Sequence, residues 1–276
     1  MIKDEVLKVL EDNKGEYISG SKLALKLNVS RTAVWKTISQ LIKEGYDIQS
    51  EKKSGYRLNQ NSDILSVVKI RQSLSSLGFE PQLKVYKTID STNKQIKLEA
   101  VNGAEEWLTI VSEEQTQGKG RKQCKFISPT SKGVYMSVLL KPLCDLSSLF
   151  VLTKMSAVAV IEAIRDITGT TLKIKAPNDI VYNGKKLCGI LTEAMIEAES
   201  SIAQFAVIGI GINVYGTDAD FTEQESHIST SLSEITGRYC NRSEIIASVI
   251  SHLYSHYKQY SLGSFDKITE IYNSLI

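Results

Sequence analysis

The spacing of the apolar residues changes along this chain, so the chain is expected to fold as two parts. Up to about residue 45 apolar residues recur at helical spacing, whereas from Lys84 onward strand-like apolar runs alternate with helical stretches. The polar run Asn59–Asp63 between them is the expected linker. A length of 276 residues also fits two domains, since about 100–200 residues per domain is typical. We therefore expect domains at residues 1–62 and 63–276.

The first domain has the pattern of a winged helix-turn-helix. The expected elements are a helix ending near residues 13–15, a helix capped by Ser19 or Ser21, a helix from about Arg31 to Glu44, and strands at 46–50 and 55–58. Ser30 is a good N-cap for the third helix, because its hydroxyl can accept a hydrogen bond from a free backbone N–H. Gly45 can end that helix.

Positive charge is concentrated in this domain. Residues 19–60 hold 8 Lys/Arg and 3 Asp/Glu, an excess that suits phosphate binding. In a winged helix the start of the last helix enters the major groove. The expected DNA-binding residues are Ser30, Arg31, Thr32, Trp35 and Lys36 of that helix, and Lys52, Lys53 and Arg57 of the wing. A module for protein contacts is the alternative, and Trp35 could contact DNA or pack on the wing.

Composition argues against membrane insertion and against a disulfide framework. The longest apolar stretches, such as residues 205–214, are about half of the ~20 residues that a spanning helix needs. The cysteines are Cys124, Cys144, Cys188 and Cys240. Their wide spacing and the lack of a CxxC pair fit a protein of the reducing cytoplasm without a cysteine zinc site.

The second domain is expected to be an α+β sheet domain with its helices to one side. Strands are expected at residues 83–86, 108–112, 133–140, 172–176, 180–182, 186–194 and 204–214, with helices from residue 64 onward and at 152–166 and 242–260. His252 and His256 lie four apart on the last helix and could bind a metal ion. With no third ligand nearby in the sequence, we expect two surface histidines and no metal site.

Two segments of this domain suit ligand binding, each with a simpler alternative. Asp90-Ser91-Thr92-Asn93 follows a strand, and its small polar side chains could contact a ligand or cap a helix. The segment from Gln115 to Phe126 interleaves glycines with cations, which suits a nucleotide phosphate or a solvated basic loop. It lacks the residue order GxxxxGK[ST] of a Walker loop.

Two further segments lie at strand ends and inside a strand. In residues 175–191, Pro177-Asn178-Asp179 is typical of a turn and Asn183-Gly184 of a hairpin, and Lys186 begins the returning strand. Gly209-Ile210-Gly211-Ile212-Asn213 places glycines inside a strand, which usually means that another group lies very close to the backbone.

In this order and at these separations, the four segments resemble the biotin protein ligase family. The whole chain is similar to its bifunctional members, which join a winged helix to the ligase and repress biotin genes. The resemblance implies a mixed β-sheet of the class II synthetase type, with biotin, ATP and Mg²⁺ as ligands. Biotinyl-AMP would form first, and biotin would then pass to a lysine of a biotin carboxyl carrier protein. Operator DNA is a second implied partner, and we expect a homodimer when ligand orders the basic loop.

The resemblance also assigns roles to individual residues. Biotin contacts are implied for Ser91, Thr92, Asn93, Gln115, Gly118, Lys119, Gly120, Arg121, Lys186 and Gly189, and nucleotide contacts for Lys119, Arg121, Phe126, Asn178 and Asn213. Lys186, Arg121 and Asp179 are the implied catalytic residues. Asn178 and Asp179 would help to place the nucleotide and Mg²⁺.

Some positions depart from the family pattern. Gln123, Cys124 and Phe126 stand where the family usually has Gly, Arg and Trp, and Ala176 replaces the aromatic residue before Pro-Asn-Asp. The usual C-terminal SH3-like barrel is expected to be absent after Ile276; either this sequence is truncated or the protein lacks that domain. Two alternatives to a ligase-repressor therefore stay open: a ligand-sensing transcription factor with weak or no ligase activity, and an enzyme acting on a related acyl substrate such as lipoate.

Overall fold

The computed structural model describes residues 2–74, 79–142, 149–196, 202–216, 228–261 and 265–276. The contacts divide the chain into two compact units, Met1–Gln72 and Ser73–Ile276. No helix among these residues is both long enough and apolar enough to span a membrane. Cys124, Cys188 and Cys240 are free thiols, whereas Cys144 lies outside the described residues.

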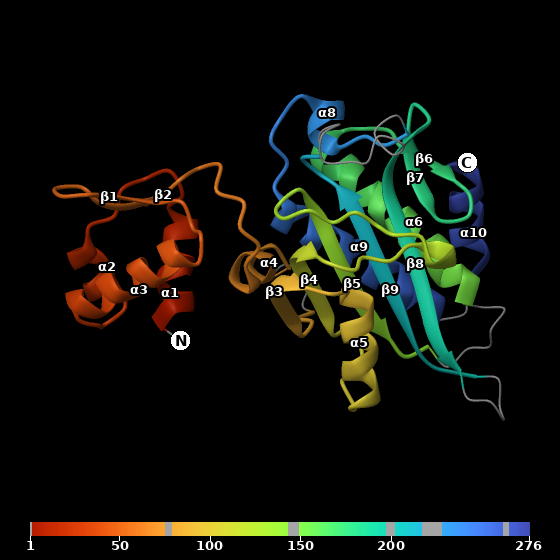
Figure 1. Cartoon of the computed structure of the whole chain (residues 1–276), viewed down its shortest axis with the longest axis horizontal. Helices are drawn as coiled ribbons and strands as arrows, with labels where there is room; N and C mark the ends of the chain where they lie inside the picture. Colours follow the sequence, from red (N-terminus) through yellow and green to blue (C-terminus); the bar gives the residue numbers. More distant parts are fainter. Residues whose placement is uncertain (1, 75–78, 143–148, 197–201, 217–227, 262–264) are drawn as a thin grey trace. The chain divides into compact units, whose positions relative to one another are not determined.

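The N-terminal unit is a winged helix-turn-helix, as predicted (Figure 1). Its elements are helices α1 (Ile2–Asp12), α2 (Gly20–Lys26) and α3 (Arg31–Lys43), followed by the antiparallel strands β1 (Ile48–Glu51) and β2 (Gly55–Leu58). Ser19 caps α2 by accepting from Lys22 N at 3.2 Å, and Ser30 caps α3 by accepting from Ala33 N at 3.1 Å. These hydroxyls satisfy backbone donors that would otherwise lack partners.

The first unit extends further than the polar linker suggested. Its core is built from the apolar faces of the three helices and β2, and the partly buried Ile64 and Val68 pack against it. The helix α4 (Val67–Leu74) also places Lys69 3.8 Å from Glu11. The contacts therefore separate the units after Gln72, beyond the boundary expected at residue 62, because the apolar residues that follow the linker complete the first core.

The second unit contains a seven-stranded mixed sheet in the order β3-β4-β5-β9-β8-β7-β6. The strands are β3 (Leu83–Ile89), β4 (Thr109–Gln115), β5 (Gly133–Leu140), β6 (Lys173–Lys175), β7 (Asp179–Tyr182), β8 (Lys185–Ile196) and β9 (Ala203–Asn213). The pair β3–β4 is parallel and the other neighbours are antiparallel. Each predicted strand is found, with ends shifted by a few residues.

Helices cover both faces of this sheet. The helices are α5 (Thr92–Val101), α6 (Leu149–Thr168), α8 (Leu232–Thr236), α9 (Arg242–Ser261) and α10 (Phe265–Ser274). In Figure 1, α6 and α9 lie behind the sheet and α5 in front of it. Every residue of β5 is buried, which requires cover on both faces. The expectation of helices on one side was therefore incomplete, because α5 covers the other face.

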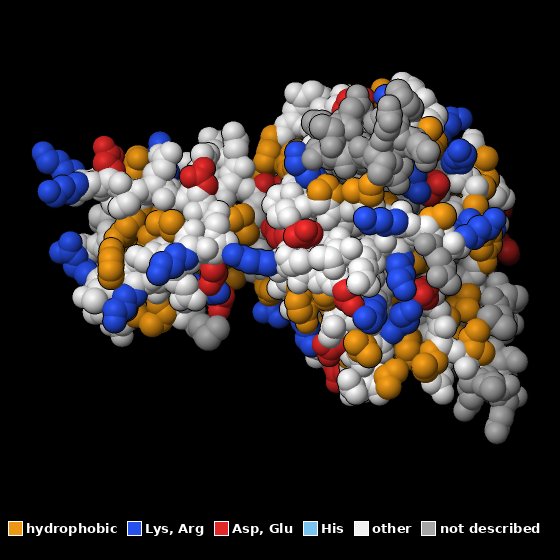
Figure 2. Space-filling model, viewed as in Figure 1, with side chains coloured by type: hydrophobic (Ala, Val, Ile, Leu, Met, Phe, Trp, Pro, Cys, Tyr) orange, Lys and Arg blue, Asp and Glu red, His pale blue; other side chains and the backbone are white. Residues whose placement is uncertain are grey.

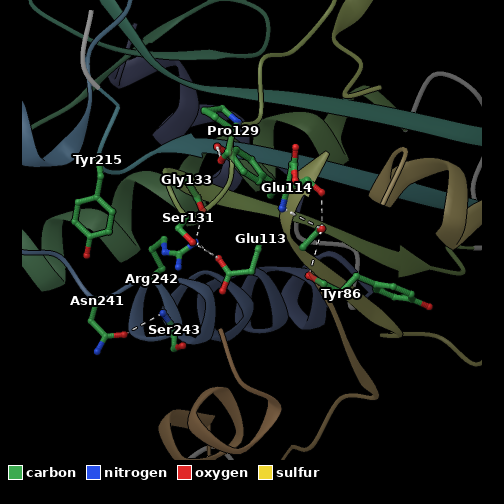
Figure 3. A network of polar contacts seen from close by, with 12 residues as sticks. Tyr86, Glu113, Glu114, Pro129, Ser131, Gly133, Tyr215, Asn241, Arg242 and Ser243 are labelled. Atoms are coloured by element: carbon green, nitrogen blue, oxygen red, sulfur yellow. Dashed lines mark hydrogen bonds and ion pairs between the residues drawn. The ribbon is translucent and has the colours of Figure 1, made fainter. Parts of the chain in front are cut away.

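A buried ion pair joins α9 to the sheet (Figure 3). The Arg242 side chain is 1% exposed, and its Nη1 lies 2.7 Å from Glu113 Oε2 of β4. The same nitrogen donates to the Gly133 carbonyl at 3.3 Å, and the Ser131 hydroxyl donates to Glu113 at 3.2 Å. Charged groups are buried at little cost when they are paired and hydrogen-bonded in this way.

Candidate functional site

A cavity of about 270 Å³ opens on the face of the sheet where α5 begins. Most of the expected ligand residues line it together: Ser91, Thr92, Asn93, Gln115, Lys119, Gly120, Arg121, Phe126, Asn178, Asp179, Lys186 and Gly189. These residues come from three of the four segments that resemble the family, so the fold brings together what the sequence keeps apart. Gly118 and Asn213 are not among the lining residues.

Glycines of β9 form the floor of the cavity. A Cβ at Gly209 would collide with the Asn93 amide, and a Cβ at Gly211 would collide with the Phe126 ring. The expectation that another group lies very close to these glycines is confirmed. The approaching groups are side chains of this chain, and they could not be named from the strand pattern alone.

The start of α5 holds a hydrogen-bond network at one wall. Ser91 caps the helix, so both alternatives for this segment apply: capping and cavity lining. Thr92 N donates to Gln115 Oε1 at 2.9 Å, which orients the Gln115 amide. Ser137 of β5 is fully buried and lies 2.7 Å from Thr92 Oγ1 and 2.6 Å from Asn93 Oδ1. Fixed groups of this kind can recognise a polar ligand with little loss of side-chain entropy.

Sequence reasoning missed Ser137 and Glu193 as parts of this network. Asn93 Nδ2 donates to Glu193 Oε2 at 2.8 Å, and Lys97 Nζ lies 2.8 Å from Glu193 Oε1. Burial raises the pKa of Glu193, but the hydrogen bonds from Lys97 and Asn93 outweigh it and leave that pKa below its usual value. Ser137 could have been noticed, because it is a hydroxyl residue within the otherwise apolar strand Gly133–Leu140. Nothing comparable in the sequence pointed to Glu193.

Two cations also line the cavity, Lys186 and Arg121. Lys186 Nζ lies 2.8 Å from Asp179 Oδ1, an oxygen shielded from solvent, and the Lys186 side chain is 35% exposed. Arg121 Nη1 donates to Asn178 Oδ1 at 3.0 Å, while Asn178 Nδ2 donates to the Ile190 carbonyl at 2.8 Å. A lysine and a guanidinium in one cavity can hold carboxylate or phosphate oxygens.

The basic loop folds as a tight hairpin, and several of its residues line the cavity. Phe126 N donates to the Gly118 carbonyl at 2.9 Å, and Gly120 N donates to the Cys124 carbonyl at 2.7 Å. A Cβ at Gly118 would collide with the Phe126 carbonyl, so this glycine closes the hairpin. The Phe126 ring lies against Gly211 and meets Tyr135 edge-on, with ring centroids 6.4 Å apart.

Asn213 lies at the end of β9, and its Nδ2 donates to the Thr230 carbonyl at 3.1 Å. This contact fixes the segment before α8 to the sheet. A nucleotide contact by Asn213 therefore stays a prediction, because its amide nitrogen is engaged by backbone away from the cavity lining.

The N-terminal unit carries a separate polar depression beside the wing. Its lining includes Arg31, Thr32 and Trp35 of α3 and Lys52 and Lys53 of the wing. Trp35 is 58% exposed, which leaves most of its ring open to a partner. Figure 2 shows Lys and Arg side chains standing out at the end of the unit that carries the wing.

Three of the predicted DNA-binding residues, Ser30, Lys36 and Arg57, do not line this depression. The Ser30 hydroxyl is engaged in capping α3. Arg57 lies over the Tyr17 ring, 4.6 Å from its centroid, and donates to Gln49 Oε1 at 2.5 Å. Lys36 is exposed on α3 but is not part of the depression's lining.

The fold and the cavity define a helix-turn-helix domain joined to an α+β ligand-binding domain. A model of the biotin/lipoate A/B protein ligase family matches residues 85–213, and an HTH domain model matches residues 3–57. The chain is 36% identical over 273 residues to the bifunctional ligase/repressor BirA of Bacillus subtilis, covering 99% of this chain and 83% of that protein. It is 28% identical over 200 residues to BirA of Escherichia coli, covering 72% and 60%.

Among solved structures, the biotin protein ligase from Aquifex aeolicus in complex with biotin and ATP is similar, with a TM-score of 0.61 and 28% identity. The match covers 71% of this chain and 78% of that one. The chain therefore belongs to the biotin/lipoate A/B protein ligase family, and it has the two-part organisation of a bifunctional ligase/repressor. The resemblance stated from its sequence motifs is confirmed.

Proposed function

We propose that this protein is an ATP-dependent biotin–protein ligase of the cytoplasm that also represses transcription in response to biotin. The observation that carries the proposal is the convergence of Lys186, Arg121 and the Thr92–Gln115 network on one cavity. It is supported by 36% identity to the BirA ligase/repressor of Bacillus subtilis over nearly the whole chain.

In the first step, the biotin carboxylate oxygen attacks the α-phosphorus of ATP, and the bond to the β-phosphate oxygen breaks to release pyrophosphate. Negative charge moves onto the α-phosphate oxygens during this step. Lys186 and Arg121 stabilise that charge, and Asp179 holds the Lys186 ammonium in place. The Ser91–Asn93 wall and Gln115 orient biotin, while Asn178 and Phe126 contact the nucleotide.

The basic loop protects the product of this step. Biotinyl-AMP is a mixed anhydride that water hydrolyses, so it has to be kept dry until the acceptor arrives. Lys119, Gly120 and Arg121 lie at the cavity and can close over the phosphate. In the second step, an acceptor lysine amine attacks the biotinyl carbonyl, the amine loses its proton, and AMP leaves. The acceptor in this proposal is a biotin carboxyl carrier protein.

Magnesium fits this cavity as a companion of the nucleotide. Asp179 is the carboxylate among the described lining residues, and Mg²⁺ commonly takes one or two carboxylates with phosphate oxygens and water. Asp179 would hold the ion beside Asn178. When bound, Mg²⁺ neutralises part of the phosphate charge.

The repressor function rests on the winged helix. Arg31, Thr32 and Trp35 of α3 would enter the major groove of operator DNA, with Ser30 and Lys36 beside them, and Lys52, Lys53 and Arg57 would contact phosphates. Two half-sites require two such units, so we include a homodimer that forms when ligand orders the basic loop. Sedimentation showing a monomer at every ligand and protein concentration at which DNA is bound would refute the dimer.

The first experiment is a calorimetric titration of biotin into the protein with and without Mg-ATP, followed by mass spectrometry for biotinyl-AMP. We expect biotinyl-AMP from the wild type and none from Lys186→Ala. Lys185→Ala is the matched control, because Lys185 is the neighbouring residue of β8 and is not among the described residues that line the cavity. Biotin binding without adenylate would instead support a ligand-sensing transcription factor with weak or no ligase activity.

A further inference from the structure

A cluster of possible metal ligands lies between α6 and α9, outside the ligand cavity. Glu162 comes from α6, and His252 and His256 come from α9. His252 and His256 are four residues apart, so they share one face of their helix. Their side chains are partly buried, with 19% of Glu162, 27% of His252 and 12% of His256 exposed. The third ligand that could not be found near the histidines in the sequence is supplied by helix packing.

The donor atoms are close enough to share one ion after small side-chain rotations. His252 Nδ1 lies 3.3 Å and His256 Nε2 lies 2.5 Å from Glu162 Oε2, and the three donor atoms all fall within 4.8 Å of one another. Zinc–nitrogen and zinc–oxygen bonds are about 2.0–2.2 Å long. Tetrahedral ligand atoms are therefore about 3.3 Å apart, the separation already present between His252 and Glu162.

A fourth residue orients the cluster from the side. His252 Nε2 lies 2.9 Å from Asp166 Oδ2, one turn further along α6. Metal-bound histidines usually donate their other ring N–H to a carboxylate or carbonyl group, which fixes the ring. With Nδ1 toward Glu162 and Nε2 toward Asp166, the His252 ring already has this arrangement.

The chemical types of the ligands also suit a cation. Glu162 contributes a carboxylate, and the rings of His252 and His256 face it from α9. A metal ion binds imidazole only in its neutral form, so the ion competes with protons for this site.

We propose that Glu162, His252 and His256 form a binding site for a transition-metal dication of the Zn²⁺ type that clamps α6 to α9. Two imidazoles and one carboxylate suit Zn²⁺, Co²⁺ or Ni²⁺, whereas Mg²⁺ and Ca²⁺ prefer oxygen ligands alone. Water would complete the coordination at the exposed side. None of the three residues lines the ligand cavity, so the clamp acts on the stability of residues 73–276 and not on the chemistry of the cavity.

The test is a titration of chelator-treated, tag-free full-length protein with Zn²⁺ by calorimetry and with Co²⁺ by visible absorption. We expect one saturable site in the wild type and its loss in His256→Gln and in Glu162→Gln. Asp166→Asn should weaken binding by about 10–100-fold, because it removes the negative charge of the carboxylate that pairs with His252. His227→Gln, which replaces the third histidine of the sequence, is the matched control and should bind as wild type does.

Thermal unfolding separates loss of the site from loss of the fold. At 100 times the dissociation constant, Zn²⁺ should raise the Tm of the wild type by about 5–10 °C. It should leave the Tm of folded His256→Gln unchanged, with folding checked by circular dichroism in the presence of chelator. The proposal is overturned if the wild type binds neither ion, if His256→Gln and Glu162→Gln still bind, or if bound Co²⁺ shows a thiolate charge-transfer band, which would place the ion on a cysteine.

Discussion

Replacing Arg242 by methionine should destabilise residues 73–276 strongly. Arg242 is 1% exposed and pairs with Glu113, which is 9% exposed, at 2.7 Å. Methionine fills much of the same volume but removes the cation that lies 2.7 Å from the buried Glu113 carboxylate. Removing one partner of a buried ion pair typically costs about 3–5 kcal/mol, because the remaining charge loses its compensation.

The hydrogen bonds around Glu113 place the expected loss of folding stability at the lower end of this range. The Ser131 hydroxyl donates to Glu113 Oε2 and remains in the variant. The Gly133 carbonyl loses the hydrogen bond that Arg242 donates to it. We therefore expect a loss of about 3 kcal/mol, which corresponds to a Tm decrease of about 6–12 °C for a unit of this size.

Denaturant unfolding followed by tryptophan fluorescence measures this loss, since Trp107 lies in the same unit. The double variant Arg242→Met with Glu113→Gln removes both charges and should recover part of the stability. Lys267→Met, at an exposed position of α10, is the control for removing a cation. A destabilisation below about 1 kcal/mol, or a double variant as unstable as Arg242→Met, would refute the assignment of the effect to the buried charge.

Three further variants test the site and the wing. Ser137→Ala should cost about 1–3 kcal/mol by denaturant unfolding and weaken biotin binding in calorimetry, because buried polar groups at the start of α5 lose a partner. Glu193→Gln should lower stability at neutral pH, because the wild-type carboxylate is paired with Lys97. The difference in stability between variant and wild type should disappear as the pH falls from about 4.5 through the lowered folded-state pKa of Glu193, since the carboxylate is then protonated in the folded and unfolded states. Lys52→Gln should weaken DNA binding and reduce the salt dependence by about one phosphate contact, whereas Lys8→Gln on α1 should leave both unchanged; equal effects of the two in fluorescence anisotropy would argue against the wing.

Local features of the second unit could be predicted because they depend on neighbouring residues. Asn183 and Gly184 have φ values of 49° and 80°, the positive values that a tight hairpin turn requires, and the pair joins β7 to β8 as expected. The strand β5 runs from Gly133 to Leu140, with the bounds that its apolar run predicted. Turn chemistry and apolar patterning act over a few residues and are therefore visible in the sequence.

Elements stabilised by distant contacts were less predictable. The helix α10 was not predicted, although Phe265, Ile268 and Tyr272 recur at helical spacing. Lys154 Nζ lies over the Tyr272 ring of α10, 5.6 Å from the ring centroid, and the Tyr272 hydroxyl donates to the Pro177 carbonyl at 3.0 Å. Neither partner is close in sequence, so the contacts that hold this short helix in place are not visible in a local pattern.

The cavity and the metal cluster differ in what a sequence can reveal about them. The cavity residues stand in short motifs, so resemblance to a family could group them before the sheet order was known. The metal cluster has no motif of its own: His252 and His256 indicate one helix face, but Glu162 lies 90 residues earlier on another helix. Periodicity shows which residues share a face and not which faces meet. A site assembled from two helix faces therefore becomes visible only when the packing of α6 against α9 is known.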